Sequence, residues 1–308
     1  MYHLKRILVC VDLTAMDEEV IRYASEVSEI MEADTVYFLH VAKDLNLPED
    51  IAKNYKDMLA PVDETIKHEV RETVRKYFPE QAGTKTHIDV LEGKPTDLVI
   101  KYAKRKDVDL IVIGKHRGKE KPKIQFDKVV ELSHCSVLYV PNGAEIKIGN
   151  IVLAMDFSEY SKLALEQALH IKEKRSAVNI YGLHVYNVPS GYHTTGKSYE
   201  EFASIMKGHA EKDAQKFFKK HKLDIENAAC EMHYALTDDD RIDDELNDFA
   251  IEKKAGMVMI GSQGRTPAAA FLLGSVAEHI LHYDNNIPVF VVKKKNENMS
   301  FLQALLKI

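Results

Sequence analysis

The chain of 308 residues has room for two domains, and 45% hydrophobic with 29% charged residues is typical of a soluble globular protein. Its formal net charge of −6 argues against nucleic acid as the main partner, because no basic excess is present to neutralise phosphates. The opening MYHLKRILVCVD has too short an apolar run for a signal peptide, and no apolar stretch approaches the ~18 residues that span a membrane. We therefore expect a cytoplasmic protein that binds neither nucleic acid nor membrane.

The first half of the chain reads as apolar strands that alternate with helices. Strands are expected at residues 7–11, 35–41, 86–91, 109–113 and 136–140. Helices are expected at residues 17–31, in a stretch ending near 78, at 95–105 and at 126–132. Pro95 suits the first turn of its helix, because proline has no N–H to leave unbonded there.

The second half repeats this order. Strands are expected at residues 151–155, 178–185, 231–236, 257–260 and 289–292. Helices are expected near 199–220 and 240–254, where apolar residues recur at helical spacing; the stripe of Ile242, Leu246, Phe249 and Ala250 is typical of a core-facing helix. The insert 187–198 is expected to be a flap beside a ligand.

Four segments recur in the same order, which indicates duplication of one domain. KRILVCVDLT returns as GNIVLAMDFS, so Asp12 and Asp156 lie 144 positions apart. LIVIG returns as MVMIG 147 positions later, and VLYV returns as VFVV. Pro141, Gly143 and Gly149 break the pattern between the halves. We expect domains at residues 1–143 and 149–295, followed by an apolar tail at 296–308 that packs on the body or on a second chain, as in a homodimer.

Continuous Val/Ile/Leu strands between helices predict an α/β fold, with a doubly wound parallel sheet of order 3-2-1-4-5 in each half. Ligands bind such sheets at the carboxyl ends of the strands, where the order reverses between the first and fourth strands. Asp156 and Gly261 stand at those two strand ends. We further expect the fifth strands, VLYV and VFVV, to join the halves as an internal pseudo-dimer.

A glycine-rich stretch, GSQGRTPAAAFLLGS, follows the fourth strand of the second half. Its spacing, Gly261-x-x-Gly264, nine residues, then Gly274-Ser275, is neither the Walker spacing nor G-x-G-x-x-G. A glycine turn between a strand and a helix lets the backbone approach an anion such as phosphate. An ordinary turn with a capping glycine remains the alternative.

Both halves resemble universal stress protein domains, and the glycine spacing matches the signature of the ATP-binding members without a gap. The resemblance implies that ATP or a related adenine nucleotide, with or without Mg²⁺, binds the second half. In that family the acidic residue after the first strand contacts the nucleoside, and a valine ending the second strand frames the adenine. The residues that it assigns to the ligand are Ala154, Asp156, Val185, Gly261, Gln263, Gly264, Arg265, Gly274, Ser275 and Val276. No catalytic or metal-ligating residue is assigned. For Asp156, a helix cap is the alternative role.

The first half departs from the signature. It keeps Asp12 and Val41, but after Gly114 it reads KHRGKEKPKIQFDKVVE, with Asp127-Lys128 where Gly-Ser is expected. A carboxylate repels phosphate, so we expect this half to have lost tight ATP binding.

The resemblance implies a stress-response protein in which one nucleotide switches interactions with protein partners that the sequence does not identify. Two alternatives remain open. One is slow ATP hydrolysis or self-phosphorylation, with Ser262, Thr266 or Ser275 as phosphoryl acceptors. The other is a scaffold without nucleotide. His40 and His184 occupy equivalent places in the repeat, as structural residues or as part of the cleft.

Overall fold

The computed structural model describes residues 3–45, 62–116, 123–223, 229–238, 241–264 and 273–296. It separates into two compact units. Of the described residues, those within 148–294 form one unit, and those within 3–147 form the other together with residues 295 and 296. The apolar tail at 297–308 lies outside the described residues.

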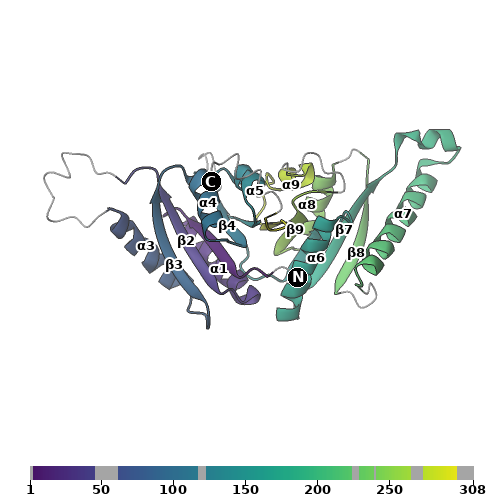
Figure 1. Ribbon diagram of the computed structural model, residues 1–308. Helices are drawn as coiled ribbons and strands as arrows, with labels where there is room; N and C mark the ends of the chain where they lie inside the picture. The colour runs from purple at the N-terminus through teal and green to yellow at the C-terminus, as the bar shows by residue number, and fades with distance from the viewer. Residues whose placement is uncertain are drawn as a thin grey trace, which may run out of the picture. The chain divides into compact units, whose positions relative to one another are not determined.

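The first unit has a parallel sheet of order β3-β2-β1-β4-β5. Its strands are β1 (Arg6–Val11), β2 (Thr35–Ala42), β3 (Lys85–Glu92), β4 (Leu110–Lys115) and β5 (Ser136–Pro141). Its helices are α1 (Met16–Met31), α3 (Val62–Tyr77), α4 (Pro95–Arg105) and α5 (Phe126–Leu132). Helices α1 and α3 pack against each other, as do α4 and α5 (Figure 1). Right-handed crossovers put the two pairs on opposite faces of the sheet.

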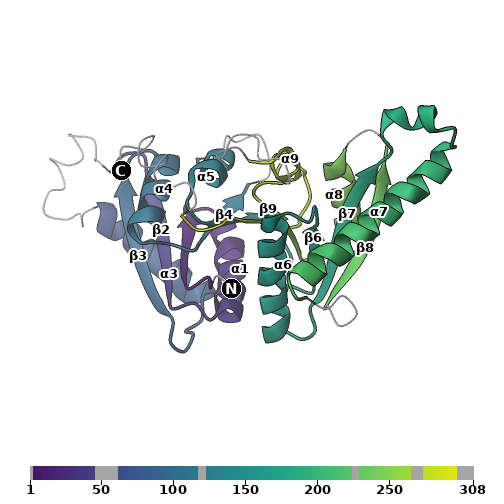
Figure 2. The same cartoon turned by 45° about the vertical axis from the view of Figure 1, so that its right-hand side comes forward.

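The second unit repeats this arrangement with the order β8-β7-β6-β9-β10, again parallel (Figure 2). Its strands are β6 (Asn150–Ala154), β7 (Asn179–Asn187), β8 (Cys230–Thr237), β9 (Met257–Gly261) and β10 (Val289–Val292). Its helices are α6 (Glu159–Lys174), α7 (Tyr199–Lys220), α8 (Ile242–Glu252), α9 (Ser275–Ile280) and the 3-10 helix η1 (Ser190–Thr195). Each unit therefore confirms the predicted 3-2-1-4-5 order.

The central strands are buried on both faces, as their unbroken apolar runs predict. Ile7, Leu8 and Val9 of β1 are 0% exposed, and so are Ile151 and Val152 of β6. Among the described helices, none is long and apolar enough to cross a membrane. The pairing of the two halves through their fifth strands stays a prediction.

The insert 187–198, which we expected to be a flap, contains helical structure, and its role beside a ligand stays a prediction. Residues 190–195 form η1, and Ser198 then begins α7 with a capping box, in which its side chain accepts from the Glu201 N–H and the Glu201 carboxylate accepts from the Ser198 N–H. Such a box satisfies two helix N–H groups at once. The insert is therefore a helical lead into α7.

Lys295 belongs to the first unit, although it follows β10 in sequence. Its Nζ lies 2.5 Å from Asp109 Oδ1 and 2.9 Å from Asp107 Oδ1. The other oxygen of Asp109 accepts hydrogen bonds from the backbone N–H groups of Lys5 and Arg6, at 2.9 and 2.7 Å. The Asp109 side chain is only 5% exposed, so this group fastens the start of β1 and Lys295 to the loop before β4.

Candidate functional site

A cavity of about 660 Å³ opens in the second unit where the strand order reverses. Its wall comes from the carboxyl ends of β6, β7 and β9, from the glycine-rich stretch and from α8 and α9. This position agrees with the rule that ligands bind doubly wound sheets at the switch point. A volume of this size is in the range of small-molecule sites.

Nine of the ten residues assigned from the sequence lie together in this wall. They are Ala154, Asp156, Val185, Gly261, Gln263, Gly264, Gly274, Ser275 and Val276. The tenth, Arg265, lies outside the described residues, as does Thr266. Residues 105 positions apart, Asp156 and Gly261, therefore share one cavity.

The turn after β6 fixes Asp156. Its Oδ1 accepts a hydrogen bond of 3.0 Å from the Ser158 N–H, and Phe157 between them has a φ of +64°. A phenylalanine in the left-handed region of backbone conformation is uncommon, and this conformation costs about 1–2 kcal/mol of free energy. The N-cap of α6 is Ser158, whose side chain accepts from the Ser161 N–H at 3.2 Å. The cap role considered for Asp156 thus belongs to Ser158.

The glycines of the stretch have different tasks. A Cβ on Gly261 would stand 2.5 Å from the Cβ of Tyr160, so this glycine lets α6 approach β9 closely. A Cβ on Gly264 would stand 3.1 Å from Asp156 Oδ2, so that glycine leaves room for the carboxylate. The Gly274 N–H donates to the Ser262 carbonyl at 3.0 Å, which brings the two ends of the stretch together.

The end of β7 turns backbone groups toward the cavity. Leu183 accepts a hydrogen bond of 2.8 Å from the Met155 N–H, just past the end of β6 at Ala154. Alternate residues of a strand direct their N–H and C=O groups to the same side, so those of Val185 face the same side as Leu183, beyond the end of β6. The His184 Nδ1–H donates to the Met155 carbonyl at 2.6 Å, and its ring stacks on Phe157. His184 is thus both structural and part of the wall.

Sequence reasoning missed part of the wall. It did not assign Met155, Leu183, Ile242, Leu246, Ile260, Leu273, Ala277 or Glu278. The α8 residues were expected in the core, which is correct for Leu246 at 1% exposed, but Ile242 is 37% exposed. Periodicity gives the inner face of a helix but not how far the helix overhangs the sheet.

At the corresponding ends of β1 and β4 in the first unit, the described residues leave a cavity of only about 30 Å³. The Asp12 carboxylate lies 2.6 Å from His116 Nε2, and the Lys123 ammonium donates to the Asp12 carbonyl at 3.2 Å. A Cβ on Gly114 would stand 2.7 Å from Val20, so α1 packs tightly against β4. Burial would raise the pKa of Asp12, but hydrogen bonds from Thr14 and His116 and the charges of His116 and Lys123 hold that pKa below its ordinary value.

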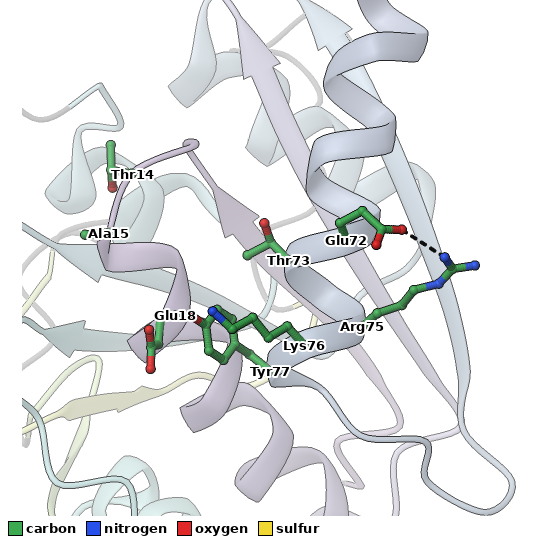
Figure 3. A pocket seen from close by; sticks show the side chains of 8 residues that line it. All are labelled: Thr14, Ala15, Glu18, Glu72, Thr73, Arg75, Lys76 and Tyr77. Atoms are coloured by element: carbon green, nitrogen blue, oxygen red, sulfur yellow. Dashed lines mark hydrogen bonds and ion pairs between the residues drawn. The ribbon is translucent and has the colours of Figure 1, made fainter.

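A second hollow, of about 760 Å³, lies between α1 and α3 of the first unit (Figure 3). Its charges are matched locally: Glu72 bonds to Arg75 at 2.8 Å, and Glu18 bonds to Arg22 at 3.1 Å. In each of these ion pairs the carboxylate is neutralised by its own guanidinium group, so we assign no ligand to this hollow. Across the described ranges, no group of three or more His, Cys, Asp or Glu residues is arranged to hold a metal ion.

Residues 3–141 and 147–293 each match the model of the universal stress protein family. The chain therefore belongs to this family and carries its domain twice.

Two universal stress proteins of Methanocaldococcus jannaschii are similar in sequence. One is 31% identical over 146 residues, covering 47% of this chain and 81% of that protein. The other is 27% identical over 157 residues, covering 47% and 95%. The solved structure of a Pseudomonas aeruginosa protein of unknown function is similar with a TM-score of 0.68 at 15% identity. The match covers 99% of this chain and 97% of that protein. At that identity the likeness supports the fold alone.

Proposed function

We propose that the second unit binds one adenine nucleotide, ATP or a close relative, and that the bound nucleotide switches interactions with protein partners in a stress response. The observation that carries the proposal is the contrast between the corresponding strand ends of the described residues, with a cavity of about 660 Å³ beside Asp156 and of about 30 Å³ beside Asp12. The family signature is intact in the second unit, beside the large cavity, and lost in the first unit, beside the small one.

The base belongs at the β7 end of the cavity. The Val185 N–H and C=O offer one donor and one acceptor there. Adenine has a matching acceptor, its ring nitrogen, and a matching donor, its amino group. The apolar wall from Leu183 and Leu246 suits the faces of a flat ring.

The phosphates belong at the glycine-rich end. Gly264 and Gly274 carry no side chain that would keep an anion from the backbone, and Ser275 supplies a hydroxyl at an exposed position. Asp156 and Glu278 are acidic lining residues, so anionic phosphates gain from a partner cation. Where Mg²⁺ accompanies ATP, it binds mainly phosphate oxygens and water.

Regulation follows from differential binding. A ligand that binds only the folded, closed form stabilises it by RT ln(1 + [L]/Kd), about 2.7 kcal/mol at a hundredfold excess over Kd. That free energy is available to shift the conformation presented to a partner. For the alternative of self-phosphorylation, Ser262 is an unfavourable acceptor, because it is 5% exposed and its backbone is bonded to Val292 and Gly274.

Calorimetric titration with ATP tests the proposal, with Asp156→Ala beside the equivalent Asp12→Ala. We expect Asp156→Ala to weaken ATP at least tenfold, the value of a lost hydrogen bond to a charged group. We expect Asp12→Ala to leave the affinity unchanged. Failure of the unaltered chain to bind ATP would overturn the proposal, and so would equal binding by Asp156→Ala.

A further inference from the structure

The apolar stripe of α8 continues past the sheet that it covers. Ile242, Leu246 and Ala250 are spaced by four residues, so they lie on one face of the helix. Helix α8 packs against β6, β7 and β8 of the sheet. Ala250 and Leu246 are 0% and 1% exposed, whereas Ile242 is 37% exposed and lines the cavity. The first residue of the stripe therefore meets the cavity rather than the core.

The first unit has no such feature. The MVMIG repeat is offset by 147 residues, which places Pro95 at the position of Ile242 and Val99 at that of Leu246. Val99 is 0% exposed, as a core residue should be. The residues around the 30 Å³ cavity come from β1, α1, β4 and the segments that follow β1 and β4, and none comes from α4. The overhanging isoleucine is therefore specific to the unit with the open cavity.

We propose that Ile242 determines recognition of the aromatic base, by covering one face of the ring while the Val185 backbone bonds its edge. This inference rests on the proposed function and names the residue that selects for a flat apolar ring. A ring that slides against Ile242 removes its remaining apolar surface from water, which favours binding. A phosphate in the same place would lose hydration without a hydrogen-bonding partner, so the phosphates lie elsewhere.

The test is titration of the full chain and its Ile242→Ala and Ile251→Ala variants with ATP, adenosine and inorganic tripolyphosphate. Ile251 is the matched control, because it lies on the same helix, is 54% exposed and does not line the cavity. Ile242→Ala should weaken ATP and adenosine by the same factor, about tenfold, the lower end for apolar groups lost from a hydrophobic pocket. It should leave tripolyphosphate unchanged, and Ile251→Ala should change nothing. Ile242→Val should lose less than Ile242→Ala, since most of its contact remains.

Two results on the variants overturn the inference while leaving the proposed function intact. One is ATP binding by Ile242→Ala equal to that of the unaltered chain. The other is a loss confined to the phosphate-bearing ligands, which places Ile242 at the wrong end. If the unaltered chain binds neither ATP nor adenosine, the proposed function fails first and this inference fails with it. Thermal unfolding of both alanine variants shows whether either has lost its fold.

Discussion

Asp12 Oδ2 and His116 Nε2 lie 2.6 Å apart in the first unit, and the residues that correspond to them in the second unit are Asp156 and Gln263. Both residues of the second pair line the open cavity. The same two positions therefore close one space and border the other. This difference is the physical reason to expect a single nucleotide site.

The Asp12–His116 contact predicts a pH-dependent cost for His116→Ala. The folded-state pKa of Asp12 lies below its ordinary value despite burial, through Thr14, His116 and Lys123. A depressed carboxyl pKa stabilises the fold above the unfolded value of about 3.9, and the gain is lost as pH falls through the folded pKa. We expect His116→Ala to lower the free energy of unfolding by about 1 kcal/mol at pH 6. Urea denaturation at pH 6 and pH 3 checks this, since the cost should shrink at pH 3; an equal cost at both would contradict it.

The raised pKa of Asp17 predicts that the stability of the fold changes with pH in the opposite direction, falling as the pH rises. Burial raises its pKa to about 6, the N–H groups of Asp12 and Leu13 oppose that shift, and the negative charge of Asp12 adds to it. The folded state then holds more protons than the unfolded state between about pH 4 and 6, so stability falls as pH rises through this window. Asp17→Asn removes the titration. Relative to the unaltered chain, this variant should gain about 2 kcal/mol between pH 4 and pH 6.5. A constant difference over that range would show that Asp17 titrates normally.

Gly261→Ala should destabilise the second unit. The added Cβ meets the Tyr160 Cβ at 2.5 Å and its backbone carbon at 3.0 Å, and a backbone atom cannot rotate away. Forced packing of this kind costs about 1–3 kcal/mol. Gly208→Ala is the control, because Gly208 lies inside α7 with open space around it. That change should raise stability by about 0.5–1 kcal/mol, since alanine is the better helix former. Thermal unfolding checks both variants, and the melting temperature should fall for Gly261→Ala and rise for Gly208→Ala.

Lys295→Met should destabilise the first unit. It leaves Asp109 buried without the ammonium group that lies 2.5 Å away. Removing one partner of a buried ion pair costs about 3 kcal/mol or more. The control is Arg75→Ala at the exposed Arg75–Glu72 pair, where both side chains are more than half exposed and the expected cost is below about 1 kcal/mol. Equal effects in guanidinium denaturation would mean that Lys295 contributes no more than a surface pair.

The sequence was sufficient for the parts of this fold that depend on periodicity and repetition. Apolar runs such as that around Val9 predict buried parallel strands, and the repeat at Asp12 and Asp156 predicts the second sheet. The switch-point rule then brings Asp156 and Gly261 together without any contact being known. These features are local or topological, so a sequence states them directly.

Other features depend on distances that no pattern contains. The separation between helix α6 and β9 decides that Gly261 accommodates Tyr160, and the overhang of α8 decides that Ile242 lines the cavity. Loss of tight ATP binding by the first half was expected from the repulsion of phosphate by Asp127, whereas the contact between His116 and Asp12 at the strand ends was not foreseen. Side-chain packing settles such points, and packing is a property of the folded chain.

The most direct measurement is the stoichiometry of ATP binding to the intact chain by calorimetry, with Gly274→Asp and His116→Gln beside it. One site per chain is expected, because the cavity at the strand ends is about 660 Å³ beside Asp156 but about 30 Å³ among the described residues beside Asp12. Gly274→Asp should abolish binding, since its carboxylate would repel the phosphates. His116→Gln should leave one site, since Asp127-Lys128 still stands where the signature has Gly-Ser. Two sites in the unaltered chain, or one site that survives Gly274→Asp, would contradict the assignment to the second unit.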